Sequence, residues 1–257
     1  MKTVILAGGF GTRLSEYTES IPKPLVEIGG KAIIYHIMSC YYKYGFHEFV
    51  IALGYKGDKI KQYFLDFPTL NSDFTIDIST KHIEIHTRKS LPWKVTLVDT
   101  GPTTMTGGRL LRLRKYLEDD TFMMTYGDGL ANINIKSLIA FHKRSSRTLT
   151  MTTVRPNARF GEVVMEKGRV VDFQEKPQLN DGWINGGFFV CNKDIFNYLE
   201  GDDEMFEREP IKRLLDANQI AGYPHEGFWK CMDNKRDKEY LEEITKERNK
   251  PWLIDEE

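Results

Sequence analysis

The chain has 257 residues, of which 36 are basic and 37 acidic, so its formal net charge at pH 7 is −1. This balance offers no overall attraction to nucleic acid or to an anionic membrane surface. The three cysteines, Cys40, Cys191 and Cys231, are widely spaced and odd in number, which argues against a disulfide framework and against a zinc site.

No apolar run of the sequence is long enough to span a membrane. The N-terminus leads directly into a strand-like segment without the pattern of a signal peptide, and we expect a protein of the reducing cytoplasm. A chain of this length buries roughly 70–75% of its unfolded surface on folding, which is enough for one large core. An α/β unit of this size is commonly a single domain.

The first 24 residues carry the most information. Residues 4–7 are apolar and predict a buried parallel strand. The heptapeptide G-G-F-G-T-R-L follows at 8–14, and Lys23 stands between two prolines, ten residues after Arg13. Glycines after a strand let the backbone approach a ligand and turn its amides inward, and the two basic side chains add positive charge. We therefore predict a cradle for a polyphosphate.

Two common phosphate-binding loops do not fit this segment. A Walker loop ends in Gly-Lys-Ser/Thr, whereas this loop ends in Gly-Thr-Arg. A dinucleotide-binding loop has a third glycine where this chain has Leu14, which disfavours a Rossmann oxidoreductase. For the glycines taken alone, a tight turn between a strand and a helix is the alternative.

The next segments alternate between helix and strand. Residues 33–42 have helical spacing and end before Gly45, residues 49–52 predict a second buried strand, and residues 58–66 a short helix. This βαβα order is typical of a parallel sheet with helices on its faces.

Residues 68–93 interrupt that order with period-2 patterning, which predicts a hairpin projecting from the α/β body. His82, Glu84 and His86 fall on one face of it, where a metal site is conceivable. A solvated or subunit-facing surface is the favoured interpretation, because the sequence shows no residues that would orient such ligands.

A second glycine-rich turn follows a strand at 95–98. It comprises D-T-G at 99–101 and T-M-T-G-G-R-L at 104–110, and the leucines after it indicate a helix. Amides and hydroxyls at such a helix start could bind an anion or contact a base, and a simple turn into the helix is the alternative.

Residues 121–125 predict a strand that ends in Y-G-D-G, which places Asp128 at the carboxyl end of a parallel strand. Open α/β sheets bind ligands at that edge, and a carboxylate there suits Mg²⁺. An aspartate that only forms a turn beside glycine is the competing interpretation. Asp233, in the motif G-F-W-K-C-M-D, is a second candidate carboxylate.

The second half predicts a helix at 135–142, a strand at 149–154, a hairpin with arms at 160–165 and 169–173, a strand at 188–191, a helix at 207–218 and a closing helix at 234–248. In the helix at 207–218, the expected apolar stripe is Ile211, Leu214 and Leu215. Glu175 and Asn185 are candidate partners for sugar hydroxyls and Lys176 for a phosphate, although each is equally acceptable as a surface turn residue.

Eight motifs together resemble the sugar-1-phosphate nucleotidylyltransferases, and the resemblance runs nearly from end to end. They are L-A-G-G-F-G-T-R-L at 6–14, P-K-P at 22–24, D-T-G at 99–101, T-M-T-G-G-R-L at 104–110, Y-G-D-G at 126–129, F-Q-E-K-P at 173–177, I-N-G-G-F at 184–188, and G-F-W at 227–229 with M-D at 232–233. The loop at 104–109, Y-G-D-G and G-F-W are typical of the branch that converts CTP and glucose 1-phosphate to CDP-glucose and pyrophosphate.

The resemblance implies an α/β fold: a Rossmann-like, mixed and mostly parallel sheet flanked by helices, with a projecting β-hairpin and a smaller C-terminal sugar-binding portion. Residues 1–257 would form one domain. Its nucleotide-binding part would cover about 1–150, with the excursion at 68–93, and its sugar-phosphate part and closing helix about 151–257. The resemblance also implies a homo-oligomer, a hexamer being one option, which the 68–93 hairpin would join.

The same resemblance assigns roles to individual residues. Catalysis would rest on Arg13, Lys23 and Asp128. Mg²⁺ would be held by Asp128 and Asp233. The nucleotide would be bound by Leu6, Ala7, Gly8, Gly9, Gly11, Thr12, Arg13, Lys23, Thr104, Arg109 and Gly127, and the sugar phosphate by Glu175, Lys176, Asn185 and Gly187.

Two alternatives keep the fold and change the function. One is the same reaction with another nucleotide, such as UTP or dTTP, or with another phosphorylated acceptor. The other is a regulatory subunit without activity, which is disfavoured because Arg13, Lys23, Asp128 and Asp233 are all present.

Overall fold

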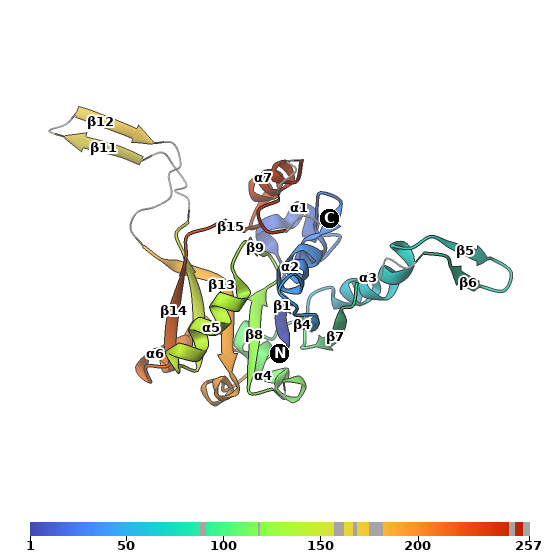
Figure 1. Cartoon of the computed structure of the whole chain (residues 1–257), viewed down its shortest axis with the longest axis horizontal. Helices are drawn as coiled ribbons and strands as arrows, with labels where there is room; N and C mark the ends of the chain where they lie inside the picture. Colours follow the sequence, from blue (N-terminus) through green and yellow to red (C-terminus); the bar gives the residue numbers. More distant parts are fainter. Residues whose placement is uncertain are drawn as a thin grey trace.

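The computed structural model describes residues 1–87, 91–117, 119–156, 162–166, 169–174, 182–246 and 250–253 (Figure 1). In these ranges seven strands form a central sheet in the spatial order β14-β10-β13-β8-β1-β4-β7. They are β1 (Thr3–Ala7), β4 (Glu48–Leu53), β7 (Lys94–Asp99), β8 (Thr121–Tyr126), β10 (Leu149–Val154), β13 (Ile184–Asn192) and β14 (Ile220–His225).

Strands β7, β4, β1 and β8 run parallel to one another. β13 is antiparallel to both of its neighbours, β8 and β10, whereas β14 is parallel to β10. In the register, Thr3 of β1 is paired with Phe49 on one side and with Met123 on the other. The predicted fold class, a mixed and mostly parallel sheet flanked by helices, is confirmed.

β1 lies at the centre of two cores, because all five of its residues are buried. Ile5 and Ala7 pack into the core on one face of the sheet, and Val4 and Leu6 pack into the core on the other. A strand that is apolar on both faces is typical of a parallel sheet covered by helices on both sides.

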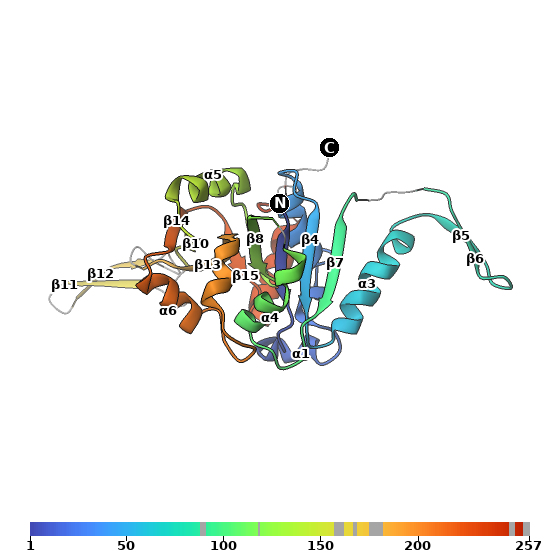
Figure 2. The same ribbon diagram turned by 90° about the horizontal axis from the view of Figure 1, so that it is seen from below.

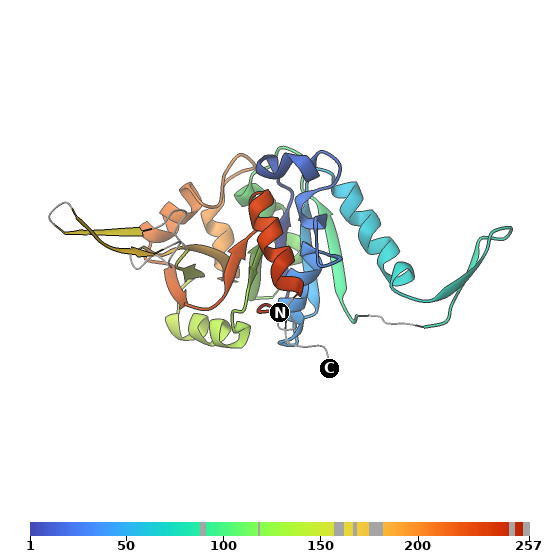
Figure 3. The same cartoon turned by 90° about the horizontal axis from the view of Figure 1, so that it is seen from above.

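One face of the sheet is covered by α2 (Ile33–Tyr42), α3 (Gly57–Leu70), α5 (Ile135–Ser145) and α7 (Lys235–Lys246). The opposite face carries α4 (Thr106–Arg112), α6 (Glu209–Asp216) and the 3-10 helices η3 (Arg114–Tyr116) and η4 (Lys193–Tyr198). Figure 2 looks onto the face with α4 and α6, and Figure 3 shows the opposite view, with α7 in front.

Shorter elements connect these layers. They are η1 (Thr12–Leu14), α1 (Ser15–Thr18), η2 (Lys23–Leu25), the pair β2 (Glu27–Ile28) and β3 (Lys31–Ala32), and the pair β9 (Gly129–Ala131) and β15 (Trp229–Cys231). Within the described residues, no helix combines the length and the apolar character that crossing a membrane requires.

Two hairpins project from opposite ends of the body, β5 (Phe74–Asp77) with β6 (His82–Ile85) and β11 (Glu162–Glu166) with β12 (Arg169–Gln174) (Figure 1). Both agree with the sequence prediction, except that the first excursion does not begin at Pro68. Helix α3 continues through that proline to Leu70. Pro68 lies in the last turn, and stacking of Phe67 on Trp93 offsets the hydrogen bond that a proline removes.

Two other predictions differ from the structure in detail. β13 begins at Ile184, so Asn185 and Gly187 lie within a strand and not before it. Helix α6 begins at Glu209, where Pro210 occupies one of the first helical positions, and Leu215 is 60% exposed. Of the two leucines, only Leu214 is buried in the core. The apolar stripe of α6 is therefore narrower than predicted.

The segment after α7 closes one face of the core. Trp252 is fully buried and donates its Nε1–H to Nδ1 of His36 at 3.2 Å. Its backbone carbonyl accepts a hydrogen bond from the Cys40 thiol at 3.4 Å. Both partners belong to α2, so a residue from the end of the described chain completes the packing of a helix near its beginning.

Candidate active site

A cleft of about 700 Å³ opens above the carboxyl ends of β1 and β8. This is the edge at which open α/β sheets bind ligands. Every predicted site residue that the structure describes lines the cleft: Leu6, Ala7, Gly8, Gly9, Gly11, Thr12, Arg13, Lys23, Thr104, Arg109, Gly127, Asp128, Asn185, Gly187 and Asp233. Glu175 and Lys176 lie outside the described residues.

Two glycines of the first glycine-rich turn, Gly8 and Gly11, are required by protein neighbours, whereas a Cβ on Gly9 would meet no atom within 4 Å. Gly11 has φ 65°, in the left-handed region, and a Cβ on it would lie 2.8 Å from Cγ2 of Thr18. A Cβ on Gly8 would lie 2.3 Å from the guanidinium carbon of Arg109. The turn after β1 is therefore fixed in shape by packing beneath it, before any ligand is considered.

Arg109 is the residue beneath that turn, and only 4% of it is exposed. Its Nη1 donates to the carbonyl oxygens of Leu53 (3.0 Å) and Gly101 (2.7 Å) and to Oγ1 of Thr100 (2.8 Å), while Nη2 donates to the carbonyl of Gly8 (3.1 Å). Burial lowers the pKa of this guanidinium, and nearby Arg112 adds to the effect. Arg109 thus ties the ends of β1, β4 and β7 together, and its contact with a nucleotide stays a prediction.

The second glycine pair packs helix α4 against the segment 202–206. The amide of Gly107 donates to the carbonyl of Glu204 at 2.9 Å. A Cβ on Gly108 would lie 2.5 Å from Cα of Asp202. The glycines at this helix start therefore permit a close backbone approach, and the Gly107 amide is already engaged by protein instead of facing an anion.

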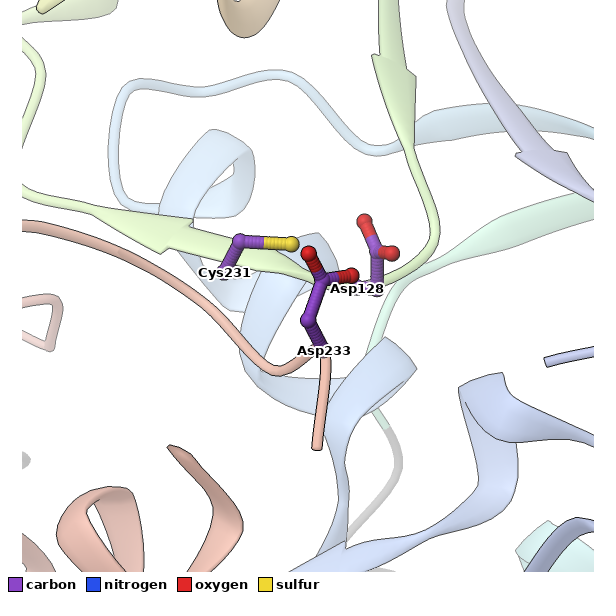
Figure 4. A group of neighbouring side chains, drawn as sticks. All are labelled: Asp128, Cys231 and Asp233. Carbon is purple, nitrogen blue, oxygen red and sulfur yellow. The ribbon is translucent and has the colours of Figure 1, made fainter. Parts of the chain in front are cut away.

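The two candidate metal carboxylates come together through the ladder between β9 and β15. Gly129 pairs with Cys231, and the amide of Met232 donates to the carbonyl of Asp128 at 2.9 Å. Asp128 and Asp233 consequently flank one end of the ladder. Their carboxylates and the Cys231 thiol point toward one another (Figure 4), with the ligand atoms all within 4.8 Å of one another.

Two basic side chains meet these carboxylates. Nζ of Lys23, which is 12% exposed, lies 2.7 Å from Oδ2 of Asp128 and 3.1 Å from Oδ1 of Asp233. Nη1 of Arg13, which is 73% exposed, lies 2.7 Å from Oδ2 of Asp233. Lys23 is held there by the turn of η2, in which Pro24 packs beside Gly127.

The charges decide the protonation of this group. Burial opposes the charge on Lys23, but the Asp128 carboxylate, with Asp233, raises the pKa of the lysine. Burial also opposes ionisation of Asp233, yet Lys23 and Arg13 lower the pKa of that carboxyl. Burial, reinforced by Asp128, raises the pKa of the Cys231 thiol. At neutral pH Asp233 is therefore ionised and Lys23 protonated, beside a neutral Cys231 thiol.

The carboxylates of Asp128 and Asp233 fit a hard divalent cation such as Mg²⁺, which prefers oxygen ligands and usually takes one or two from the protein. Asp128, Cys231 and Asp233 form the one group of potential metal ligands within the described ranges. The conceivable site on the hairpin, His82 with Glu84 and His86, is not such a group. Nε2 of His86 is instead hydrogen-bonded to Oγ1 of Thr75 at 2.8 Å.

Asn185, Gly187 and Tyr126 also line the cleft and contact one another. Oδ1 of Asn185 accepts from the amide of Gly187 at 2.8 Å, and its Nδ2 lies 3.5 Å from the Tyr126 hydroxyl. Gly187 has φ 77°, and a Cβ on it would lie 2.7 Å from the Tyr126 ring. The predicted role of Gly187 in sugar binding is untested, and the structure shows that it makes room for this tyrosine.

Several lining residues are missing from the predicted site. Tyr126, Thr106, Met205, Trp229 and Cys231 all line the cleft. Tyr126 and Trp229 lie within the quoted motifs, so motif membership could have found them. Met205 has no such signal, because it reaches the cleft only through the packing of the segment 202–206 on α4.

Comparison with known proteins shows the family of this chain. The profile of the family described as "Nucleotidyl transferase" matches residues 2–233. The chain is 46% identical over 253 residues to the glucose-1-phosphate cytidylyltransferase of Salmonella typhi, covering 98% of each protein. It is 44% identical over 255 residues to the probable glucose-1-phosphate cytidylyltransferase of Bacillus subtilis, covering 99% of this chain and 100% of that one.

The fold also matches solved structures. A putative glucose-1-phosphate thymidylyltransferase from Bacillus anthracis superposes with a TM-score of 0.70 at 16% identity, covering 98% of each chain, which shows the same fold. Nucleotidyl transferases typically depend on a metal, which agrees with the paired carboxylates in the cleft. The family profile spans both glycine-rich turns and both carboxylates, and we conclude that this chain belongs to the nucleotidyl transferase family.

Proposed function

We propose that the protein is a glucose-1-phosphate cytidylyltransferase, which transfers the cytidylyl group of CTP to glucose 1-phosphate and releases pyrophosphate. The observation that carries the proposal is the contact of Lys23 with both Asp128 and Asp233 in the cleft, next to Arg13. The two substrates follow from the names of the relatives that share 44–46% of its residues over nearly its whole length.

The reaction requires two anions to meet. An oxygen of the sugar phosphate attacks the α-phosphorus of CTP in line with the departing pyrophosphate, and most of the catalysis lies in positioning and in charge neutralisation. Lys23 stabilises negative charge on the α-phosphate, and Arg13 the leaving pyrophosphate, for which a planar guanidinium is well suited. Because the attacking phosphate is already ionised near pH 7, no general base is needed.

Asp128 and Asp233 would hold Mg²⁺. When bound, the ion would supply charge neutralisation between the two phosphate groups. The same two carboxylates also hold Lys23 and Arg13 at the cleft through ion pairs. Asp128, Lys23 and Arg13 are therefore the proposed catalytic residues.

The rest of the cleft would bind the substrates outside the reacting groups. Leu6 to Gly9 would lie against the base and ribose, and Gly11 and Thr12 beside the phosphates, with Thr104, Arg109 and Gly127 completing the nucleotide side. Asn185 and Gly187 would bind the sugar phosphate, together with Glu175 and Lys176.

The test is pyrophosphate release with Mg²⁺ and glucose 1-phosphate, comparing CTP, UTP, dTTP, ATP and GTP. We expect a strong preference for CTP. Preference for UTP or dTTP would keep the mechanism and replace the nucleotide, which is the alternative function. No release with any of the five nucleotides would contradict glucose 1-phosphate as the acceptor, and other phosphorylated sugars would then be compared.

We also propose that the protein is a homo-oligomer, a hexamer being one arrangement, joined through the hairpin β5–β6. The support is the set of apolar side chains that this hairpin exposes away from the body. Phe74, Ile76, Ile78 and Ile83 are 38–78% exposed, and a patch of this kind is typical of a protein–protein contact.

A further inference from the structure

A carboxylate from outside the predicted site joins two walls of the cleft. Glu207 lies just before α6, and one of its oxygens, Oε1, accepts a hydrogen bond from the Tyr126 hydroxyl. Its other oxygen, Oε2, accepts from Oγ1 of Thr106 at 2.7 Å. Tyr126 at the end of β8 and Thr106 at the start of α4 both line the cleft, so a single side chain fixes two of its walls.

The hydrogen-bond directions around Tyr126 are set by this contact. A phenol has one proton to donate, and here that proton goes to Glu207, so the phenolic oxygen can only accept from other groups. Burial, reinforced by Glu207, raises the pKa of Tyr126, which keeps the proton in place. Toward the cleft, Tyr126 therefore presents an acceptor.

The amide of Asn185 is oriented by the same group of residues. Its Oδ1 accepts from the amide of Gly187 at 2.8 Å, so its Nδ2 donates one hydrogen to the Tyr126 oxygen at 3.5 Å and keeps a second N–H. The Tyr126 oxygen, an acceptor, and the Asn185 amide, an N–H donor, consequently lie side by side at the cleft. That pairing matches a hydroxyl group, which donates one hydrogen bond and accepts another.

The Thr106 contact links the same carboxylate to the nucleotide side. Oγ1 of Thr106 accepts from the amide of Phe206 at 2.8 Å, so its own proton goes to Glu207. The neighbouring amides of Met105 and Gly107 donate to the carbonyls of Asp202 and Glu204. The segment 202–207 and the segment 104–107 are therefore fastened to each other at the cleft.

We propose that Glu207 is a positioning residue of the transferase reaction, which acts through Tyr126 to present the acceptor–donor pair of Tyr126 and Asn185 to a hydroxyl of the sugar phosphate. This inference rests on the proposed function. Glu207 need not touch either substrate, since its effect reaches the sugar through the tyrosine hydroxyl.

The test measures steady-state kinetics for Glu207→Ala, Glu207→Gln and Tyr126→Phe, with Glu209→Gln as a matched control from the same exposed segment. In Glu207→Ala we expect the KM for glucose 1-phosphate to rise about tenfold, as loss of a substrate hydrogen bond commonly causes. The KM for CTP should change less, because the amides of Met105 and Gly107 still fasten the segment 104–107 when the Glu207 side chain is removed. The control should resemble the wild type. Glu207→Gln retains one acceptor oxygen and should recover part of the loss.

Two further readouts separate positioning from a general loss of structure. The double variant of Glu207→Ala and Tyr126→Phe should be no worse than the worse single variant, because both changes act through one hydroxyl. Sugar phosphates that each lack one hydroxyl should show one position at which the wild type discriminates and Glu207→Ala no longer does. Thermal unfolding would identify any variant whose fold, and not its substrate contact, has been lost.

The proposal is overturned if the double variant shows the sum of the two single effects, or if the KM values for CTP and for the sugar phosphate rise equally. It is also overturned if Glu207→Gln and Glu209→Gln behave alike and like the wild type. Failure of the proposed function has a different signature, since the wild type itself would then be inactive with CTP and glucose 1-phosphate. If the wild type prefers another sugar phosphate, the variants are compared with the wild type on that substrate, and the same outcomes decide the proposal.

Discussion

At the scale of single residues, the charged side chains at the cleft are paired with one another. Lys23 and Arg13 contact Asp233, and Lys23 also contacts Asp128, so two cations and two carboxylates form one connected group. Each basic group has a partner on the protein and another expected on the substrate.

Removing either charge of the partly buried pair of Lys23 and Asp128 should abolish most of the turnover. We expect Asp128→Asn and Lys23→Ala each to lower kcat by about 10²–10³, as loss of a transition-state electrostatic contact commonly does. Initial rates of pyrophosphate release at saturating substrates are the measurement. Lys59→Ala, an exposed lysine on α3, is the control for the lysine change. A variant with unchanged kcat would remove that residue from the mechanism.

Arg109→Ala should affect the nucleotide more than the sugar. The change removes the side chain that holds the carbonyls of Gly8, Leu53 and Gly101, so the turn after β1 loses its support. We expect a higher KM for CTP with a smaller change for glucose 1-phosphate, and a lower melting temperature because the buried carbonyls lose their donor. Equal KM effects for both substrates would count against this role.

The sequence indicates which residues gather at the cleft but not what holds them there. Gly8 appears next to a strand, where close approach of a ligand is the natural interpretation, while its steric constraint comes from Arg109, about a hundred positions away. Gly108 similarly depends on Asp202. For these two positions, the steric constraint that requires glycine comes from a residue that is distant in the sequence. A single sequence does not show which distant residues become neighbours in space.

At the scale of elements, the start of α7 fixes one of the two carboxylates. Oδ1 of Asn234 accepts from the amide of Asp237 at 3.1 Å, and Oδ2 of Asp237 accepts from the amides of Asp233 and Asn234 at 3.0 and 3.2 Å. This reciprocal pattern is a capping box. Because the box includes the amide of Asp233, the start of the helix holds the backbone of the predicted metal ligand in place.

Asp237→Ala should therefore lower both stability and activity. Loss of the cap should cost about 0.5–2 kcal/mol in the free energy of unfolding. The lost support of Asp233 should lower kcat as well. Chemical denaturation and steady-state rates are the measurements. Glu239→Ala, which replaces an exposed residue of the same helix, is the control. A destabilised variant with full kcat would show that the cap does not govern the carboxylate.

The segment between η4 and α6 should show a pH-dependent stability. Glu204 is partly buried, which opposes its ionisation, but the amide of Glu200 and the guanidinium of Arg213 lower its pKa from 4.5. A lowered pKa stabilises the folded state above pH 4.5, and this contribution disappears as the pH falls through the folded-state pKa.

Glu204→Gln should accordingly lower the free energy of unfolding by about 1–3 kcal/mol at neutral pH. The difference from the wild type should shrink as the pH is lowered below 4.5, the ordinary pKa of this group. Urea denaturation over a pH series is the measurement. A difference that stays constant down to acid pH would contradict the role of the charge.

Elements that are long enough to show a repeating residue pattern can be predicted from the sequence, whereas very short ones cannot. The strands at 49–52 and 95–98 and the helix at 33–42 appear where their spacing predicts them. The pair β9–β15 has three residues in each strand, too few for a repeating pattern, although it is the ladder that joins Asp128 to Asp233. The helix predicted to end at residue 66 extends through Pro68 to Leu70. The residue before the proline, Phe67, stacks on Trp93, and this long-range contact is not visible in the local sequence.

At the scale of the whole molecule, one sheet runs through both halves of the chain. β13 inserts between β8 and β10 in the antiparallel sense, so strands from before and after residue 150 are neighbours. The alternation of strands and helices predicts a parallel sheet, but it does not predict the insertion, which depends on contacts between distant segments. That insertion brings Asn185 of β13 to the cleft that Lys23 also lines.

The association state should depend on the hairpin β5–β6. We expect a variant in which residues 71–90 are replaced by a short Gly-Ser linker to have a smaller mass in solution, measured by light scattering. Ile76→Lys with Ile83→Lys should have the same effect with the hairpin retained, because charges would replace exposed apolar side chains. Thr80→Lys, in the turn, is the control. An unchanged native mass in the deletion variant would exclude the hairpin as the contact.

The packing of Trp252 on α2 has a consequence for the order of events during folding. His36 and Cys40 acquire their tryptophan partner only from residues more than two hundred positions later, and the carboxylates meet only once β15 has paired with β9. Such distant pairings form slowly, because the chain must first close long loops. During refolding, we therefore expect secondary structure to recover before the ability to bind a divalent cation and nucleotide, which makes ligand binding a reporter of the last step.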